Sequence, residues 1–381
     1  MKRIAQAPAA KADGAETLFD PTFSEAVIRW QKQHGRHALP WQNTRDAYRI
    51  WLSEIMLQQT QVAAVIPYYQ RFLARFPDVA SLAAASSEEV MSHWSGLGYY
   101  SRARNLHRCA QIIVAEFDGK FPEHPELLAE LPGIGRSTAA AIAAFAYGAR
   151  AAILDGNVKR VFARVFGIEG FPGAKPVEDG LWRRAVALLP SKDVEAYTQG
   201  LMDLGATLCT RSKPSCRQCP LSQRCIALAS DRVHSLPERK PKKAIPERAT
   251  AMLVVTDRDH VLLEQRPGSG IWGGLLSLPE LEGEERDLGE GRQRFDELVS
   301  RKLASFGHVV SCERLQPFTH VFTHFKLHVS PYQIRLASRA QLAAEASHVW
   351  YRAEQLQDAP LPAPVKKLLL AVFRGGDLLT A

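Results

Sequence analysis

The sequence lacks any apolar run that approaches the roughly 20 residues needed to cross a bilayer. Residues 1–20 contain Lys2, Arg3 and Lys11 among many alanines, but they include no apolar core. This segment therefore has the composition of a loose tail and not that of a secretory signal peptide. Both absences lead us to expect a cytoplasmic protein without a membrane partner.

Cysteine is also scarce, with six residues in a chain of 381, which excludes a small disulfide-dense fold. A composition of 46% hydrophobic and 23% charged residues excludes bulk disorder and collagen-like sequence. A chain of this length exceeds what one compact core usually organises, so two domains are expected.

The sequence also lacks a large excess of either positive or negative charge, because the net charge is only +8. Residues 1–230 carry +6, residues 231–248 carry +3 and residues 249–381 carry −1. A basic first part joined to a near-neutral second part fits a polyanionic partner, and it fits an ordinary soluble surface equally well.

What the sequence does contain, from residue 22 to about residue 229, is helical periodicity interrupted by Pro and Gly. The predicted helices are 22–34, 46–75, 86–94, 101–117, 125–130, 137–147, 156–166, 178–189 and 194–205. No strand pattern interrupts them, so this part is predicted to be all-α.

The periodicity changes after a basic, proline-containing stretch at residues 231–248, which is predicted to be an extended linker. Alternation with a period of two follows at 251–255 and 261–265, around a turn at 257–259, and again at 321–329. We therefore predict a flexible tail (1–21), an all-α domain (22–230), the linker, and an α+β domain (249–381).

Four of the six cysteines crowd into seventeen positions, as Cys209-x6-Cys216-x2-Cys219-x5-Cys225. In a chain without an export signal, this crowding indicates metal ligation more than disulfides. Zinc and a four-iron four-sulfur cluster both accept four thiolates, and spacing does not choose between them. A centre saturated by cysteine has no open position for substrate, so a structural role is expected.

A second motif is Leu131-Pro132-Gly133-Ile134-Gly135-Arg136-Ser137-Thr138, which runs into an alanine-rich helix. Two glycines one residue apart allow a tight turn with exposed N–H groups, and the helix N-terminus adds a positive dipole end. The motif is typical of a phosphate-binding hairpin, although an ordinary helix–helix turn has the same spacing.

Two carboxylates have contrasting settings. Asp155 follows an apolar stretch and precedes a predicted helix, where it would cap the helix and could remain ionised beside a developing cation. Glu54 shares a helix face with Ile50, Trp51 and Leu57, and desolvation there should raise its pKa and keep a proton available. Pairing of Glu54 with Arg49 is the structural alternative.

Together these motifs resemble the helix-hairpin-helix DNA glycosylase superfamily, and within it the adenine DNA glycosylases of the MutY type. The resemblance covers nearly the whole chain, through Leu39-Pro40-Trp41, residues 51–62, Gly96-Leu97-Gly98-Tyr99-Tyr100, the hairpin, residues 154–158, Met202-Asp203-Leu204-Gly205-Ala206 and the four cysteines. It implies a 4Fe–4S cluster in the cysteine loop, a monomer associated with the bacterial nucleoid, and removal of adenine mispaired with 8-oxoguanine or guanine in duplex DNA.

The resemblance also implies roles for particular residues. Glu54 corresponds to the general acid that protonates adenine N7, and Asp155 to the carboxylate that stabilises the oxocarbenium-like sugar. The positions that match contacts to the DNA, the flipped base or the 8-oxoguanine in this domain are Trp41, Leu57, Gln58, Gln59, Leu97, Gly98, Tyr99, Gly133, Gly135, Ser137, Asn157 and Gln199.

Ser137 departs from those superfamily members that also cut the strand, because they place a lysine amine at this position to form a Schiff base. A serine hydroxyl cannot form a Schiff base. The substitution predicts hydrolysis of the base alone, leaving an abasic site.

The second domain resembles a Nudix fold with a broken catalytic box. Gly274-x5-Glu280 matches the start of the box, but Leu288-Gly289-Glu290-Gly291 lacks the paired glutamates that would bind Mg²⁺, so nucleotide hydrolysis is not expected. Phe322, Thr323 and His324 match a loop that recognises 8-oxoguanine, with Thr in place of the usual Ser; an alternating strand is the structural alternative.

Two other functions compete with the glycosylase. A non-catalytic DNA-binding module would need neither Glu54 nor Asp155, and a nucleotide-pool hydrolase would need the missing box carboxylates.

Overall fold

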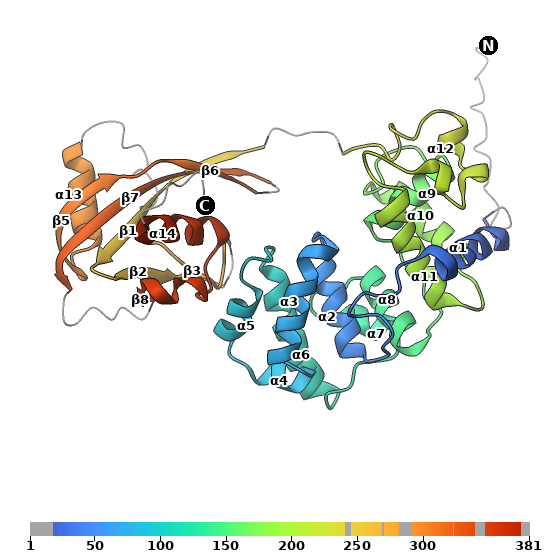
Figure 1. Cartoon of the computed structure of the whole chain (residues 1–381), viewed down its shortest axis with the longest axis horizontal. Coiled ribbons are helices and arrows are strands. Elements are labelled where there is room, and N and C mark those ends of the chain that lie inside the picture. Colours follow the sequence, from blue (N-terminus) through green and yellow to red (C-terminus); the bar gives the residue numbers. More distant parts are fainter. Residues whose placement is uncertain are drawn as a thin grey trace, which may run out of the picture. The chain divides into compact units, whose positions relative to one another are not determined.

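The computed structural model describes residues 18–240, 245–268, 270–281, 292–322, 324–339 and 347–374. Its contacts divide the chain into two compact units, residues 1–59 with 112–241 and residues 60–111 with 242–381 (Figure 1). Within the described part of the chain, no helix is both long and apolar enough to span a membrane.

The first unit consists of helices whose starts are fixed by capping side chains and prolines. Asp20, Asp46 and Asp155 each accept a backbone N–H at a helix N-terminus, and prolines occupy the first turn of three helices. The helices are α1 (Pro21–His34), α2 (Ala47–Leu57), α7 (Pro125–Glu130), α8 (Arg136–Tyr147), α9 (Gly156–Val165), α10 (Lys175–Ala187), α11 (Val194–Asp203) and α12 (Ile226–Ala229).

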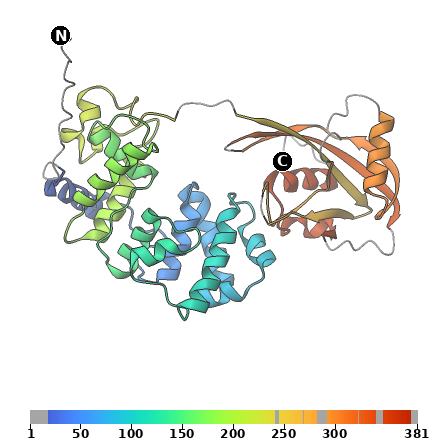
Figure 2. The same ribbon diagram turned by 180° about the vertical axis from the view of Figure 1, so that it is seen from behind.

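The core of this unit joins segments that are far apart in the sequence. Helix α1, the first helix in the described residues, lies beside α11, as the views from the front and from behind show (Figures 1 and 2). Phe23 of α1 is fully buried and packs its ring edge-on against Phe162 of α9 and Tyr197 of α11. Burial of such aromatic side chains contributes about 1.5–3 kcal/mol each, so this cluster fixes α9 and α11 firmly.

The N-terminal stretch of the second unit, residues 60–111, contains α3 (Val62–Arg75), α4 (Val79–Ala84), α5 (Ser87–Trp94) and most of α6 (Ser101–Glu116). The prediction of one helix over 46–75 is wrong, because α2 ends at Leu57 and α3 begins at Val62. Gln59 has a φ of 58°, a left-handed conformation that stops an α-helix. The short helix α4 was also not predicted.

The same unit contains a mixed sheet in the order β3 (Leu276–Ser277), β2 (His260–Gln265), β1 (Glu247–Asp257), β7 (Lys326–Arg339), β5 (Gly307–Arg314). Strands β1 and β7 are parallel and the other pairs are antiparallel. Three further strands pair off this path: β4 (Glu280–Leu281) with β1, β6 (Phe318–Val321) with β7, and β8 (His348–Arg352) with β2.

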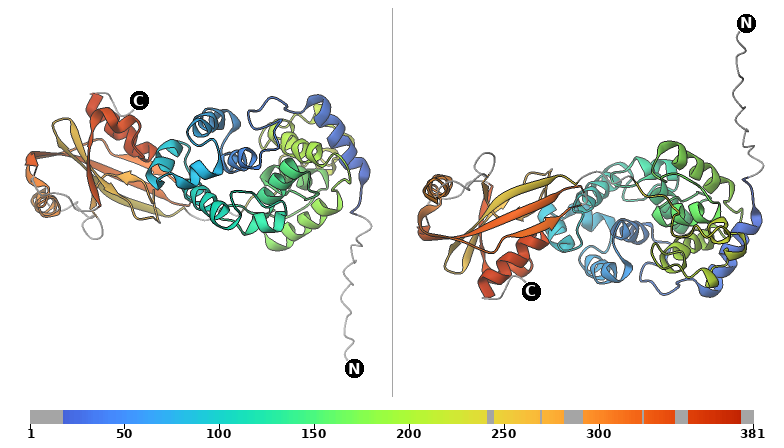
Figure 3. Two further views of the ribbon diagram at one scale, coloured as in Figure 1. Left: turned by 90° about the horizontal axis from the view of Figure 1, so that it is seen from below. Right: turned by 90° about the horizontal axis from the view of Figure 1, so that it is seen from above.

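Helices cover both faces of this sheet. Residues 251–255 of β1 are buried without alternation, which is typical of a strand that is covered on both sides. Figure 3 shows α13 (Arg292–Lys302) on one face and α14 (Ala363–Arg374) on the other. Phe295 and Val299 of α13 contribute to one core, with Leu253 and Val255 of β1.

The predicted strand over 321–329 is correct at Val321 and from Lys326 onward, but its continuity through residues 322–325 is wrong. Strand β6 ends at Val321, β7 begins at Lys326, and these two residues pair across an antiparallel hairpin. The Phe322 N–H donates to the Phe325 carbonyl oxygen at 2.9 Å and closes the turn. Phe322 and His324 therefore lie in a hairpin turn, and the strand alternative for this motif is excluded at these two residues.

Candidate active site

Glu54 lies on α2 among buried neighbours, where Ile50, Trp51 and Ile55 are each at most 3% exposed. Burial, and secondly the negative charge of Asp155, raises the pKa of Glu54 to about 8. Arg49, the sequence-based alternative partner, forms an ion pair with Asp46 at 3.4 Å. Within the described residues no hydrogen bond to the Glu54 carboxyl is found, so nothing there favours its ionised form.

Asp155 caps the N-terminus of α9, as its position in the sequence predicts. Its Oδ1 accepts the Val158 N–H at 2.8 Å, and its Oδ2 accepts from the Asn157 Nδ2 at 3.2 Å. Burial raises the pKa of Asp155, whereas these two donors and the positive charge of Arg160 act against that rise. Asp155 thus has the partners of an ionised carboxylate, and Glu54 does not.

The electrostatic coupling of the two carboxyls brings together residues 101 positions apart in the sequence. Both side chains remain partly exposed to solvent, although most of their surroundings are apolar. Two carboxylates in one low-dielectric site cannot easily carry charge together. Among the described residues, hydrogen-bond donors contact Asp155 and none is found for Glu54, so the arrangement favours a proton on Glu54 and a charge on Asp155.

The predicted hairpin lies between α7 and α8. Gly133 has a φ of 80° and requires glycine, whereas Gly135 has an ordinary φ of −86° and serves as the N-cap of α8. The Gln58 Nε2 donates to the Gly133 carbonyl oxygen at 3.5 Å, so the end of α2 contacts the hairpin. Both glycines are exposed, as a backbone that binds phosphate must be.

Ser137 connects the hairpin helix to the segment that carries Asp155. Its Oγ accepts the Leu154 N–H at 2.9 Å, one residue before the carboxylate. The hydroxyl therefore fixes the backbone that leads into the cap of α9.

Gln199 lies on α11, and its Nε2 donates to Oδ1 of Asp203 at 2.8 Å. Asp203 is fully buried and also binds Arg36, through the Arg36 backbone N–H and its guanidinium, at 2.7–2.8 Å. Asp203 and Arg36 received no role in the sequence analysis. The sequence feature that could have identified Asp203 is its position between Met202 and Leu204 in an apolar run, because a buried carboxylate needs a partner.

The remaining predicted DNA contacts differ in exposure. In the first unit Trp41 is buried at 8% exposure, Leu57 and Gln58 are half-buried, and Gln59 is exposed. In the second unit Leu97 is buried at 7%, Gly98 is half-buried and Tyr99 is 47% exposed. Gln59 and Tyr99 both have left-handed backbones, which are uncommon for side chains of this size.

The hairpin turn after β6 carries a cluster of aromatic rings. Phe322 stacks on Phe325 with centroids 4.3 Å apart, and it lies edge-on to His320 at 4.6 Å. Trp272 contacts both Phe322 and His320. Thr323 lies outside the described residues. His324 follows it in the sequence and is exposed, so the described part of the turn combines packed aromatic rings with one exposed imidazole.

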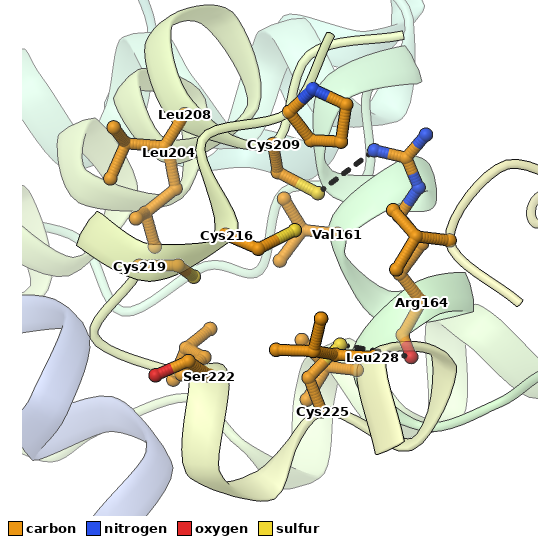
Figure 4. Close-up of a pocket in the computed structure, with 14 residues that line it drawn as sticks. Val161, Arg164, Leu204, Leu208, Cys209, Cys216, Cys219, Ser222, Cys225 and Leu228 are labelled. Carbon is orange, nitrogen blue, oxygen red and sulfur yellow. Dashed lines mark hydrogen bonds between the residues drawn. The ribbon is translucent and has the colours of Figure 1, made fainter. Parts of the chain in front are cut away.

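All four clustered cysteines line one pocket between α9 and the chain that follows α11 (Figure 4). Its other walls are mostly apolar and include Val161, Leu204, Leu208 and Leu221. Burial raises the pKa of Cys219 to about 11 and raises that of Cys225, and the neighbouring thiolates add to both shifts. Four thiols in an apolar pocket fit a polynuclear cluster, whose positive iron ions would stabilise the thiolates.

No group of three or more His, Cys, Asp or Glu residues in the described part of the chain is arranged to hold a single metal ion.

Arg164 was missed by the sequence analysis and is only 2% exposed. Its guanidinium donates to Sγ of Cys209 at 3.4 Å, and its carbonyl oxygen accepts from Sγ of Cys225 at 3.5 Å (Figure 4). The sequence feature that could have identified Arg164 is the presence of an arginine on the apolar face of α9.

Comparison with known proteins places these features in a family. The sequence profile of the HhH-GPD superfamily of base excision DNA repair proteins matches residues 52–185. The adenine DNA glycosylase of Buchnera aphidicola subsp. Acyrthosiphon pisum is 36% identical over 348 residues, which cover 91% of this chain and 96% of the relative. The chain belongs to the adenine DNA glycosylases.

A second relative supports the same family, and a solved structure resembles about half of the chain. The human adenine DNA glycosylase is 32% identical over 408 residues, covering 93% of this chain and 74% of the human protein. A solved thermostable thymine-DNA glycosylase is 28% identical with a TM-score of 0.51, and the match covers 55% of this chain and 96% of that one.

The NUDIX domain profile matches residues 250–371 of the chain. The predicted fold class, a helix-hairpin-helix domain followed by a Nudix-like α+β domain, is therefore confirmed. The prediction of an enzyme is confirmed too: the protein is a DNA glycosylase of base excision repair.

Proposed function

We propose that this glycosylase hydrolyses the N-glycosidic bond of adenine opposite 8-oxoguanine, or opposite guanine, in duplex DNA and leaves an abasic site. The observation that carries the proposal is the coupled pair of Glu54 and Asp155, in which one carboxyl has a pKa near 8 and the other has hydrogen-bond donors. Binding of DNA without chemistry would require neither feature.

The two carboxyls divide the chemistry between them. Adenine is turned out of the duplex at a cost of a few kcal/mol, which a mispair lowers. Protonated Glu54 then donates to N7 of adenine and converts the base into a neutral leaving group. Ionised Asp155 stabilises the cation that develops on the sugar, and Glu54, now deprotonated, accepts a proton from the water that attacks C1′.

Three exposed or partly exposed residues of the first unit are proposed to hold the substrate. Gln199 presents an amide whose N–H is already bound by Asp203, so its oxygen remains to accept from the exocyclic amine of adenine. Gly133 and Gly135 are proposed to bind backbone phosphates through exposed N–H groups.

The proposal of base hydrolysis without strand cleavage rests on Ser137. Its hydroxyl accepts the Leu154 N–H and carries no amine for a Schiff base. Lys159, a lysine on α9, forms an ion pair with Glu178 at 2.5 Å. Incubation with 8-oxoguanine:adenine duplex and borohydride should give no covalent adduct, and trapping of the wild type at high yield would overturn this part.

Recognition of the opposite base is assigned to the Nudix-like domain. The turn that holds Phe322 and His324 has a stacked aromatic base, and Thr323 supplies a hydroxyl in the sequence between them. Gln59, Leu97, Gly98 and Tyr99 are proposed to enter the stack or contact 8-oxoguanine.

The four cysteines are proposed to hold a 4Fe–4S cluster that stabilises the loop around them. When bound, the cluster supplies positive charge to the thiolates and links Cys209 to Cys225 across the loop. Iron and sulfide analysis of the purified protein should give about four of each per chain, and one zinc would contradict the cluster.

The protein is further proposed to be a cytoplasmic monomer that associates with the nucleoid.

The decisive experiment measures adenine release from duplexes under single-turnover conditions. One duplex contains 8-oxoguanine:adenine, a second guanine:adenine and a third thymine:adenine. Release is expected from the first two and fastest from the first, because the 8-oxoguanine contacts add to transition-state binding. Absence of release from the 8-oxoguanine duplex would refute the proposal.

A further inference from the structure

We propose that Arg102 is a positioning residue for DNA distortion, which fixes the loop at residues 95–99 and the turn at Gln59-Thr60 relative to each other. The inference rests on the proposed function, because both segments carry side chains expected to enter the base stack. Arg102 acts on them through their backbones and through Thr60, and it does not touch the reacting bond.

The loop at residues 95–99 has a backbone that few sequences adopt. Gly96, Gly98 and Tyr99 have φ values of 97°, 73° and 49°, all in the left-handed region. The turn before α3 contains a second such residue, Gln59, at 58°. For side chains of this size such backbones cost about 1–3 kcal/mol each and persist where neighbouring groups impose them.

Arg102, in the first turn of α6, supplies those neighbouring groups. Its side chain is buried, with 7% exposure, and its Nη2 lies 3.1 Å from Thr60 Oγ1, 3.3 Å from the Leu97 carbonyl oxygen and 3.1 Å from the Gly98 carbonyl oxygen. A single amino group thus contacts both segments. Gln59 is bonded directly to Thr60, so its backbone is held from the next residue.

Aromatic rings hold the guanidinium in this position. The Arg102 guanidinium carbon lies 5.2 Å from the centroid of the Trp94 ring and 5.4 Å from that of Tyr99. The Trp94 Nε1 also donates to the Gly98 carbonyl oxygen at 3.1 Å. The contact between Arg102 and the half-exposed Tyr99 orients the ring of that residue as well as its backbone.

Other groups hold the start of the loop and leave Arg102 a separate task. The Tyr68 hydroxyl donates to the Ser95 carbonyl oxygen at 3.0 Å, and the Tyr100 hydroxyl accepts the Gly96 N–H at 3.3 Å. These contacts fix residues 95 and 96, whereas Arg102 fixes residues 97–99 and connects them to Thr60. Loss of Arg102 should therefore loosen the tip of the loop and not unfold it.

Lysine cannot replace this arrangement. A guanidinium is planar, so it can stack between rings while its N–H groups remain directed at fixed acceptors, but an ammonium is a point charge on a flexible stem. Side chains that wedge into DNA must withstand the few kcal/mol that oppose unstacking. If the loop at residues 95–99 moved when its side chains entered the stack, the target base would return to the stack.

The test uses the full-length protein and a duplex with 2-aminopurine at the target position opposite 8-oxoguanine, because 2-aminopurine fluorescence rises when the base leaves the stack. Arg102→Lys is compared with wild type, with Thr60→Val and with Arg108→Lys, an exposed arginine on the same helix. At equal bound fraction, Arg102→Lys should lose most of the rise. On a matched duplex with adenine at the target position, it should release adenine about 10- to 100-fold more slowly, as expected for hydrogen bonds to a charged donor.

Thr60→Val removes one acceptor without changing the size of the side chain, and it should lose part of the rise. It also decides the matter if Arg102→Lys does not fold. Arg108→Lys should match the wild type, and the pH profile of Arg102→Lys should keep the wild-type shape. A normal fluorescence rise in both folded variants would overturn the positioning role. A wild type that shows the rise but releases no adenine would instead refute the proposed function.

Discussion

The Glu54 carboxyl shows how one residue can be made an acid near neutral pH by its surroundings. The expected consequence is a rate of adenine release that falls above pH 8, tenfold per pH unit, because the pKa of Glu54 is about 8 and the acid must be protonated. Glu54→Gln should lose about 10²- to 10⁴-fold in single-turnover rate and should lack this alkaline limb.

The control for this prediction is Glu25→Gln, an exposed glutamate on α1, which should leave both rate and profile unchanged. Retention of the alkaline limb in Glu54→Gln would assign the titration to another group.

The raised pKa of Glu54 also makes the free energy of unfolding of the protein fall as the pH rises. Because the pKa of Glu54 lies near 8 when folded and near 4.5 when unfolded, unfolding releases a proton between these values. Its contribution to stability is fully present below pH 4.5 and is lost as the pH rises through 8.

Glu54→Gln should remove this loss. Relative to wild type, its free energy of unfolding should rise by about 2 to 3 kcal/mol between pH 5 and pH 8, after allowance for partial solvent exposure of the carboxyl. Urea titrations at the two pH values measure the difference, and parallel changes in both proteins would show that the Glu54 carboxyl is already ionised in the folded state across this pH range.

At the scale of one element, Asp155 has two roles at the N-terminus of α9: it caps the helix, and its charge takes part in the chemistry. Substitutions of Asp155 can separate these two roles. Asparagine caps helices about as well as aspartate does, whereas alanine does not. Asp155→Asn should be as stable as the wild type, and Asp155→Ala should lose about 1–2 kcal/mol. Both should lose activity, because neither carries the charge that stabilises the sugar cation.

Thermal melts and single-turnover rates of the two variants provide the measurement. Full activity of a stable Asp155→Asn variant would leave Asp155 with its capping role alone.

The elements were predictable where local chemistry determines them. Asp46, Asp155 and the Pro residues in first helical turns marked where helices begin, and these signals act within a few residues. The breaks at 58–61 and 322–325 were missed. Gln59 adopts a left-handed backbone without being glycine, and Phe322 continues the alternation of β6 through a turn.

Pairings over long sequence distances were the part of the candidate site that the sequence could not supply. Asp203 binds Arg36 across 167 positions, and Ser137 accepts the Leu154 N–H across 17. Residue type and spacing indicated that Glu54, Asp155 and the four cysteines carry chemistry. Which partners orient them depends on the packing of α1, α8, α9 and α11, and no local signal specifies that.

At the scale of the whole molecule, the uneven charge predicts that affinity and discrimination respond differently to salt. The excess of +6 lies in residues 1–230 and +3 in residues 231–248, whereas residues 249–381 carry −1. Contacts of basic groups to phosphates weaken with salt, by a slope of about −0.9 per contact in a plot of log K against log salt. Contacts to one oxidised base depend on hydroxyls and aromatic rings.

Affinity for 8-oxoguanine:adenine and for undamaged duplex should therefore fall in parallel between 50 and 200 mM salt, values in the range where phosphate contacts dominate. The ratio of the two affinities should stay nearly constant. Thr323→Ala should lower the ratio and leave the salt slope unchanged, because it removes a hydroxyl and no charge. Equilibrium titrations of both duplexes measure slope and ratio, and a ratio that collapses with salt would move recognition of 8-oxoguanine from the neutral Nudix-like domain to the basic part of the chain.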